Sequence, residues 1–192
     1  MKKIFIASKN KGKTDEIKYF LKGLKIEFHS FLDKPEIPNI KETGKTFEEN
    51  ALIKAKAVYD IVNIPVLADD SGLEVDFLDG EPGVYSARYA GENATDLENC
   101  EKLLRKLKNI KLKDRKARFK CVLLLYDGSS VRYFNGICEG HIASQMRGKG
   151  GFGYDPLFLP EGYTKTFAEL DLETKNKISH RGKALQKLRD YL

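Results

Sequence analysis

A short apolar run that ends in two adjacent aspartates constrains this chain more than any other stretch. Residues 64–68 are apolar, Asp69 and Asp70 follow, residues 71–72 are Ser-Gly, and residues 73–77 alternate in polarity. Adjacent carboxylates repel each other unless a cation, a shared proton or several donors lies between them. We therefore expect a buried strand that ends at the pair, and a turn at residues 71–72. The pair is either a ligand site, as at strand ends in α/β proteins, or a structural turn in which Asp70 accepts backbone N–H groups.

Length and composition predict an ordinary water-soluble globular protein. The 192 residues suffice for one substantial core, or for two small lobes that share one. Hydrophobic residues make up 41% and charged residues 32% of the chain, and no apolar run approaches the roughly 18 residues that span a bilayer. The N-terminal residues enter a strand-like run without a secretory signal. We expect a cytoplasmic location and no membrane partner.

The net charge of +6 permits attraction to polyanions, but the lysines are spread through every segment. The most basic stretch comprises Arg105, Lys106, Lys108, Lys111, Lys113, Arg115 and Lys116. We interpret this stretch as a solvated helix end and loop, and we expect no stable nucleic-acid partner. The three cysteines, Cys100, Cys121 and Cys138, have no metal-ligand spacing and are expected to be reduced, buried thiols.

The N-terminal segment predicts a strand, a loop and a helix. Residues 3–7 are a buried strand, residues 8–13 are a loop rich in lysine, and apolar residues then recur at helical spacing through Leu24. Such a loop places free N–H groups and the positive end of a helix dipole where a phosphate could bind, with Lys13 adding a charge. The alternative is an ordinary helix start that Asn10 caps.

The middle of the chain alternates between strands and helices. Residues 25–31 predict a second strand, and a loop broken by Pro35, Pro38 and Gly44 follows. Thr46 and Glu49 have the spacing of a capping box, which predicts a helix through about Asn63. Glu49 therefore has a structural explanation as the second half of that box.

The second half begins with a loop over residues 80–91. Thr95 and Glu98 form another capping-box pattern before a helix, and strands are expected at 117–126 and 131–143 around a turn at 127–128. Gly136 and Gly140 predict bends or bulges in the second of these strands. A glycine-rich loop at 147–155 follows, and a last helix begins after Ser179-His180-Arg181-Gly182.

The aromatic residues of the glycine-rich loop allow two interpretations. Phe152 or Tyr154 could stack on a nucleotide base, or the loop could be a flexible connection whose aromatic residues cover the core.

Several of these segments together resemble one enzyme family. The segments are Ser8-Lys9-Asn10-Lys11-Gly12-Lys13, Thr46-Phe47-Glu48-Glu49-Asn50-Ala51, Leu67-Ala68-Asp69-Asp70-Ser71-Gly72-Leu73, Gly83-Val84-Tyr85-Ser86-Ala87-Arg88-Tyr89, Gly151-Phe152-Gly153-Tyr154-Asp155-Pro156 and Ser179-His180-Arg181. In this order they are similar to the inosine triphosphate pyrophosphatase family, which also includes dITP/XTP pyrophosphatases. The resemblance runs from about residue 3 to the C-terminus.

The resemblance implies a Mg²⁺-dependent enzyme that cleaves ITP, dITP or XTP between the α- and β-phosphates, giving the monophosphate and pyrophosphate and so cleansing the nucleotide pool. It implies an α/β fold with an elongated central mixed β-sheet, flanking helices, and two lobes with an active-site cleft between them. Residues 1–192 would form a single catalytic domain, usually as a homodimer.

By position, the resemblance implies that Asp70 is the proton acceptor that activates water and a ligand or near-ligand of Mg²⁺. The triphosphate would contact Ser8, Lys9, Asn10, Lys11, Gly12 and Lys13. Asn50, Lys54 and Glu49 would line the phosphate and metal end, and Ser71 would touch the substrate. The base and sugar would be surrounded by Phe152, Gly153, Tyr154, Asp155, Lys175, His180 and Arg181.

The metal ligands allow alternatives. Where the family often has a carboxylate three residues before the glycine at position 44, this chain has Lys41, and Glu42 is adjacent. A shift of one residue in an extended segment redirects a side chain. Glu42, Glu49 and Asp69 are therefore alternative ligands beside Asp70. Mg²⁺ suits the chemistry because it prefers oxygen ligands and bridges carboxylates to phosphates.

Base recognition also has two interpretations. His180 and Arg181 offer donors to the C6 oxygen of hypoxanthine and xanthine, which adenine lacks. The alternative is that the two residues form a capped, solvated helix start.

Two other functions compete with the purine pyrophosphatase. One is a pyrophosphatase for pyrimidine nucleotides. The other is a basic nucleic-acid-binding module, which would leave the aspartate pair unexplained.

Overall fold

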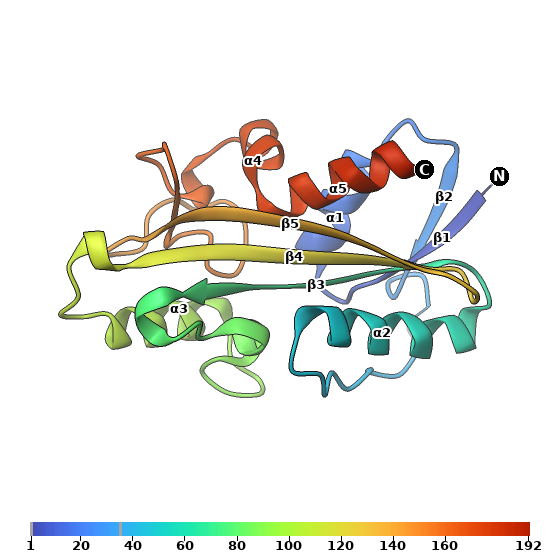
Figure 1. Ribbon diagram of the computed structural model, residues 1–192, viewed down its shortest axis with the longest axis horizontal. Coiled ribbons are helices and arrows are strands. Elements are labelled where there is room, and N and C mark those ends of the chain that lie inside the picture. The colour runs from blue at the N-terminus through green and yellow to red at the C-terminus, as the bar shows by residue number, and fades with distance from the viewer. Residues whose placement is uncertain (1, 35) are drawn as a thin grey trace. The chain divides into compact units, whose positions relative to one another are not determined.

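The computed structural model describes residues 2–34 and 36–192 of the chain (Figure 1). The strands are β1 (Lys2–Ala7), β2 (Ile26–Ser30), β3 (Val66–Val75), β4 (Lys116–Tyr126), β5 (Val131–Ile142) and β6 (Phe158–Pro160). The α-helices are α1 (Lys11–Phe20), α2 (Phe47–Val62), α3 (Asp96–Lys106), α4 (Leu172–Ile178) and α5 (His180–Tyr191). The 3₁₀ helices are η1 (Asp76–Leu78), η2 (Gly83–Arg88), η3 (Leu112–Asp114) and η4 (Phe167–Glu169). Pro35, one of the expected loop breakers, lies outside the described residues.

The strands form one mixed sheet in the order β2-β1-β3-β4-β5-β6. Strand β1 runs parallel to both of its neighbours, with Ile4 opposite Phe28 on β2 and Ile6 opposite Leu67 on β3. Strand β6 runs antiparallel to β5, where Gly140 lies opposite Pro160. A side chain at Gly140 would collide with the backbone of β6, so close approach of that strand explains this glycine. The α/β class and the mixed sheet are confirmed.

The chain divides into two compact units, each with its own core. The first unit contains the residues up to Asp70, Cys121–Gly136 and Arg181–Leu192, and the second contains Ser71–Lys120 and Ile137–His180. Strands β3, β4 and β5 contribute residues to both units. In the first unit α1 and α5 cover one face of the sheet and α2 covers the other (Figure 1).

The helices of the first unit begin and end where side chains satisfy the backbone. Asn10 caps α1 by accepting the N–H of Lys13 at 3.0 Å. Thr46 caps α2 by accepting the N–H of Glu49, and Asn63 ends the helix in the left-handed conformation with φ of 50°. The expected caps at both helices are confirmed. Both helices therefore start at fixed positions beside β1 and β3.

The second unit packs around aromatic residues. The rings of Phe119 and Phe158 lie 4.8 Å apart, and those of Phe158 and Phe167 lie 4.9 Å apart. Helix α3 begins with the complete capping box that Thr95 and Glu98 predict, because both reciprocal hydrogen bonds are present. The capping box fixes the residue at which α3 begins.

The prediction of a turn after the aspartate pair is wrong. Strand β3 continues through residues 69–72 to Val75, so the two aspartates lie within a strand and not at its end. The backbone at Leu73 remains extended because its N–H is satisfied by Ser86 Oγ at 2.9 Å. Asp76 and Phe77, which were expected to end the alternating strand, belong to η1 instead.

The expectation that the whole basic stretch is solvated is wrong for Arg115. This side chain is 5% exposed, and its guanidinium donates to the carbonyls of Leu107, Ile110 and Ala143 at 2.8, 2.9 and 3.0 Å. Leu107 is the C-cap of α3, where the last helical C=O groups lack helical partners, and Ile110 lies three residues later. Arg115 therefore connects the residues that end and follow α3 to Ala143, which follows β5. The other basic residues of the stretch are exposed.

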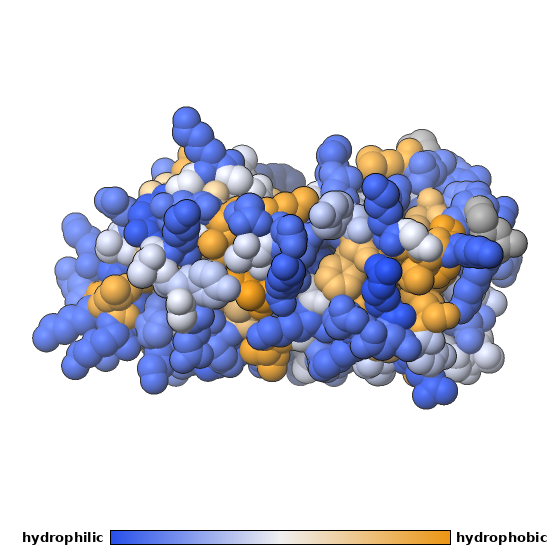
Figure 2. All heavy atoms as spheres, turned by 90° about the horizontal axis from the view of Figure 1, so that it is seen from above, coloured by the Kyte–Doolittle hydropathy of each residue, from blue (hydrophilic) through white to orange (hydrophobic). Residues whose placement is uncertain are grey.

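One face of the molecule carries mainly hydrophilic side chains, between which hydrophobic groups form separate patches (Figure 2). No helix in residues 2–34 and 36–192 has the length and hydrophobicity needed to cross a membrane.

Arg115→Ala should lower the free energy of unfolding by about 3 kcal/mol, because it leaves three carbonyls without their charged donor. Urea unfolding measures this change. Lys113→Ala removes the side chain of an exposed residue two positions before Arg115, and it should change the free energy of unfolding by less than about 0.5 kcal/mol. Equal losses in the two variants would show that the guanidinium does not stabilise the helix end.

Candidate active site

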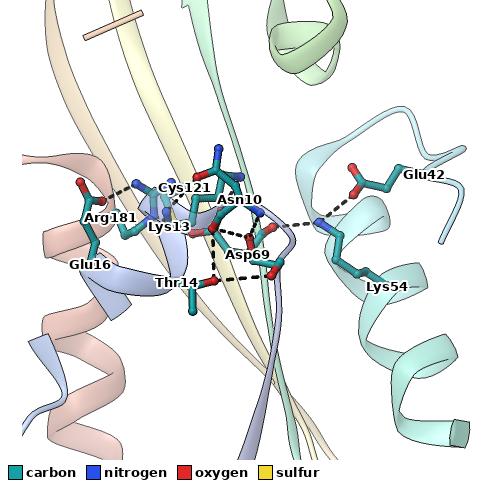
Figure 3. Close-up of polar contacts among 10 residues, drawn as sticks. Asn10, Lys13, Thr14, Glu16, Glu42, Lys54, Asp69, Cys121 and Arg181 are labelled. Atoms are coloured by element: carbon teal, nitrogen blue, oxygen red, sulfur yellow. Dashed lines mark hydrogen bonds and ion pairs between the residues drawn. The ribbon is translucent and has the colours of Figure 1, made fainter. Parts of the chain in front are cut away.

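A buried carboxylate lies at the centre of the polar residues of the first unit. Asp69 is 1% exposed, and its Oδ1 lies 2.7 Å from Lys13 Nζ, while its Oδ2 accepts from Arg181 Nε at 2.8 Å (Figure 3). Burial by itself would raise the pKa of Asp69, but the charges of Arg181 and Lys13 outweigh burial and hold the pKa well below its usual range. Asp69 is therefore ionised and engaged on both oxygens.

Arg181 extends this group to a second carboxylate. The side chain is 2% exposed, and its Nη1 donates to Glu16 Oε2 at 2.7 Å (Figure 3). Cys121 adds a weak contact from its Sγ to Asp69 Oδ2 at 3.5 Å. Two cations and two anions thus compensate one another, as buried charges require; Asp69, Arg181 and Glu16 are buried, and Lys13 is partly exposed. We call Lys13, Asp69, Arg181 and Glu16 the buried ion cluster.

Asp70 has the opposite electrostatic environment from its neighbour. It is 7% exposed, and burial raises its pKa to about 6. The charges of Lys54 and Lys13 lower this pKa, whereas those of Glu42 and Asp69 raise it further. A carboxylate with a pKa near neutrality can exchange a proton at physiological pH, as a general base must.

Lys54 connects the aspartates to the loop before α2. Its Nζ lies 2.8 Å from Glu42 Oε1 and donates to the backbone carbonyl of Asp69 at 2.9 Å (Figure 3). The lysine is 8% exposed, so its charge is held close to the carboxylates of this region. Lys54, Glu42 and Asp70 are therefore electrostatic neighbours on three different segments.

Asn50 fixes the backbone of the Glu42 loop. Its Oδ1 accepts the N–H of Gly44 at 2.7 Å, and its side chain is completely buried. A Cβ atom at Gly44 would lie only 2.7 Å from this oxygen, so a larger residue would displace the loop.

Glu49 accepts the N–H of Lys45 at 2.7 Å and not that of Thr46, so the second half of the expected capping box is replaced by a contact one residue earlier.

The loop before α1 is also internally bonded. Ser8 Oγ accepts the N–H of Asn10 at 3.2 Å, and Thr14 Oγ1 donates to the carbonyl of Asn10 at 3.2 Å. Lys9 and Lys11 are exposed: Lys9 lies over the ring of Phe31, and Lys11 pairs with Asp15. The loop is thus a fixed helix start with two lysines at the surface and Lys13 turned to Asp69.

The second unit holds a separate group of the expected residues. Asp155 and Lys175 form an ion pair at 2.6 Å, and both are buried. Lys175 Nζ also lies 4.9 Å from the centre of the Phe152 ring, and Asp155 Oδ2 accepts the N–H of Phe152 at 2.9 Å. Gly151 leaves space for that carboxylate, which a side chain at 151 would overlap. Phe152, Asp155 and Lys175 are therefore held together by direct contacts with one another.

His180 packs beside the same group. Its ring stacks on Phe119 with centres 4.6 Å apart, and it lies 6.5 Å from Phe167, whose ring Lys175 Nζ approaches to 5.8 Å. The side chain is 4% exposed. The alternative of a solvated helix start at His180 and Arg181 is wrong, because both residues are buried at the first turn of α5.

The donor set fits a divalent ion only if the substrate supplies further ligands. Within the described ranges 2–34 and 36–192, no three His, Cys, Asp or Glu side chains gather closely enough to hold a metal ion by themselves. Asp70 and Glu42 are two oxygen donors whose charges interact, and Mg²⁺ typically binds one or two carboxylates together with substrate phosphates and water. Asp69 and Glu49 are already engaged by Lys13, Arg181 and the N–H of Lys45.

The sequence pattern of the Ham1 family matches residues 4–191. This match covers nearly the whole chain. The chain belongs to the Ham1 family. A dITP/XTP pyrophosphatase of Oceanobacillus iheyensis is 52% identical over 194 residues, covering 100% of this chain and 98% of the relative. A dITP/XTP pyrophosphatase of Geobacter sulfurreducens is 51% identical, covering 100% of this chain and 97% of the relative.

Solved structures of the Ham1 family share the fold. A HAM1 protein from Coxiella burnetii superimposes with a TM-score of 0.90 at 44% identity, covering 100% of this chain and 98% of that protein. Membership in the Ham1 family confirms the resemblance that the motifs indicate. The roles of individual residues remain predictions.

The structure brings together two of the expected sets, each within its own unit. The first unit gathers Lys13, Lys54, Asp70 and Glu42, with Ser8, Asn10 and Gly12 at the start of α1. The second gathers Phe152, Gly153, Tyr154, Asp155, Lys175 and His180, and Ser71 lies on the β3 segment of that unit. Arg181, expected beside the base, has its Nε and Nη1 bonded to carboxylates in the first unit.

Sequence reasoning missed Glu16. Glu16 lies three residues after Lys13 and next to the buried Ile17, so a charged residue on the apolar side of α1 was the available indication. The prediction that Cys100, Cys121 and Cys138 are buried thiols is confirmed, and only the contact of Cys121 with Asp69 had no indication in the sequence. Burial raises the pKa of Cys121 well above its usual value, and the thiol is therefore unreactive.

Arg181→Ala should lower the free energy of unfolding by about 3–5 kcal/mol, because it leaves the buried Asp69 and Glu16 without their shared cation. Urea unfolding compares this variant with Arg189→Ala, which removes an exposed arginine from the same helix and should cost about 1 kcal/mol or less. Similar losses in the two variants would contradict a stabilising ion cluster.

Ionisation of Asp70 should destabilise the metal-free protein. The folded state retains this proton up to about pH 6, whereas an unfolded chain releases it near pH 4. The penalty is therefore absent below about pH 4 and complete above about pH 6. In the presence of a metal chelator, the free energy of unfolding of Asp70→Asn relative to that of wild type should rise by about 2–3 kcal/mol as the pH rises from about 4 to about 6. A pH-independent difference in urea unfolding would be evidence against the raised pKa.

Proposed function

We propose that this chain hydrolyses the triphosphates of deaminated purines, namely ITP, dITP and XTP, to the monophosphate and pyrophosphate. The observation that carries the proposal is Asp70: a buried carboxylate with a pKa near 6, beside two lysines, in a chain half identical to dITP/XTP pyrophosphatases over their full length. A carboxylate that can accept a proton near neutral pH, next to fixed positive charge, suits the hydrolysis of a polyphosphate.

In the proposed reaction, Asp70 accepts a proton from water as the water oxygen bonds to the α-phosphorus. The bond from the α-phosphorus to the bridging oxygen breaks, and pyrophosphate leaves with the electron pair of that bond. Lys13 and Lys54 lie where their charges can offset the negative charge that develops on the phosphates. The buried ion cluster keeps Lys13 in place, since Asp69 holds its Nζ.

Asp70 and Glu42 would hold Mg²⁺ together with the substrate phosphates. When bound, the ion neutralises phosphate charge and polarises phosphoryl oxygens. Support comes from the donor chemistry, since two carboxylates interact electrostatically beside the lysines. Lys54 pairs with Glu42, and the same lysine could instead contact a phosphate when the ion occupies Glu42.

Base and sugar contacts are proposed for the second unit. The Phe152 ring offers a face for stacking, and Lys175 and His180 offer polar groups beside it. A donor aimed at the C6 oxygen would favour hypoxanthine and xanthine, because adenine would leave that donor unpaired.

The proposal includes action as a homodimer in the cytoplasm, where nucleotide pools are used for synthesis. Light scattering of the purified protein measures the assembly.

A substrate panel tests the function directly. Release of pyrophosphate from ITP, dITP and XTP should exceed release from ATP, GTP, dTTP and UTP, and it should require Mg²⁺. Preference for dTTP or UTP would instead support a pyrimidine pyrophosphatase. Absence of hydrolysis together with strongly salt-dependent binding of polynucleotides would support a nucleic-acid-binding module.

Asp70→Asn should reduce turnover of ITP by about 100-fold or more, because amide oxygen is a much weaker proton acceptor. Asp60→Asn is the matched control, since Asp60 is an exposed aspartate on α2 of the same unit and should leave turnover unchanged. Circular dichroism verifies that both variants are folded. Turnover near the wild-type rate in Asp70→Asn would remove this residue from the proposed role.

A further inference from the structure

The loop over residues 151–155 is held in part by two side chains of α3 that lie outside the segments resembling the enzyme family. Asp96, the first residue of α3, accepts the N–H of Gly153 on its Oδ2 at 2.7 Å. One turn later, Cys100 Sγ lies 3.4 Å from the carbonyl of the same glycine. The first two turns of α3 therefore contact both polar groups of the Gly153 backbone.

These contacts act on a backbone that cannot hold its shape alone. Gly151 and Gly153 have φ values of 74° and 59°, in the left-handed region that favours glycine. Glycine loses more conformational freedom on ordering than any other residue, so a loop with two such positions needs external partners to remain in one conformation. Asp96 and Cys100 provide them.

The hydrogen bonds fix the backbone on both sides of Phe152. The N–H of Phe152 belongs to the peptide plane before its Cα and is accepted by Asp155 Oδ2 at 2.9 Å. The N–H of Gly153 belongs to the plane after that Cα and is accepted by Asp96. A hydrogen bond on each plane restricts φ and ψ of Phe152 and so limits where its ring can lie, and the ring lies beside Lys175.

The same turn of α3 also holds a second loop. Asn99 Oδ1 accepts the N–H of Ala90 at 2.7 Å, and its Nδ2 donates to the carbonyl of Ala87 at 3.2 Å. That loop in turn contacts the first one, since Tyr154 OH donates to the carbonyl of Ser86 at 2.9 Å. The start of α3 thus connects the two irregular segments of its unit, and the complete capping box at Thr95 keeps this start in place.

We propose that Asp96 is a positioning residue for base recognition: it holds the 151–155 loop so that the Phe152 ring is ready to stack on the purine. This inference rests on the proposed function and adds a residue to it. Asp96 touches the loop backbone and acts through Phe152. Its removal should therefore weaken substrate binding more than it slows the chemical step, because preorganisation lowers the cost of binding.

Asp96→Ala and Asp96→Asn form a matched pair. Both remove the negative charge from the first turn of α3, so both lose the same interaction with the helix dipole. Only Asn retains an oxygen that can accept the N–H of Gly153. With ITP as substrate, Asp96→Ala should raise KM roughly fivefold and leave kcat within about twofold, and Asp96→Asn should restore most of the wild-type KM.

Amide hydrogen exchange gives a second measurement that needs no substrate. The Gly153 amide should exchange faster in Asp96→Ala than in wild type, and Asp96→Asn should restore protection. Equal KM values in the three proteins would overturn the inference while leaving the proposed function intact. Equal effects of Ala and Asn would also overturn it, since charge and not the hydrogen bond would then be responsible. A wild-type protein that fails to hydrolyse ITP, dITP and XTP would overturn the proposed function and this inference with it.

Discussion

The buried carboxylate of Asp69 is the interaction on which the first unit depends. Three elements meet there, because Asp69 lies on β3, Lys13 on α1 and Arg181 on α5. Burying these charges is costly, and only mutual compensation makes it tolerable. Glu16 completes the balance on the far side of Arg181. Residues far apart in the sequence are therefore held in one arrangement, and Lys13 is one of them.

The strand geometry gives the two adjacent aspartates different tasks. Successive side chains in a strand point to opposite faces, so Asp69 and Asp70 have separate surroundings although their backbones touch. One carboxyl has its pKa held well below its usual range, and the other has its pKa raised to about 6. Divergent pKa values in neighbouring carboxyls are the basis for assigning Asp70 the proton transfer and Asp69 a structural role. A turn at this point would not have enforced that separation.

Both units use polar side chains to hold backbone or cations near the residues that would contact substrate. Asp155 binds Lys175 and the N–H of Phe152 in the second unit, and Asp96 holds the following N–H. In the first unit Asn50 does the same for the loop that carries Glu42. Positioning by polar side chains that do not themselves react is expected where loops must be ordered before binding.

Local sequence determined the helix starts at Asn10, Thr46 and Thr95, the mixed α/β alternation and the family, because caps, periodicity and motif order are properties of neighbouring residues. The continuation of β3 through residues 71–72 was decided by the tertiary structure, which satisfies its backbone from the distant Ser86. Likewise, Arg115 was expected to be solvated, and Arg181 was expected either beside the base or in a solvated helix start. Only the folded chain brings carbonyls and carboxylates around them, because compensation of a buried charge comes from segments that sequence spacing does not connect.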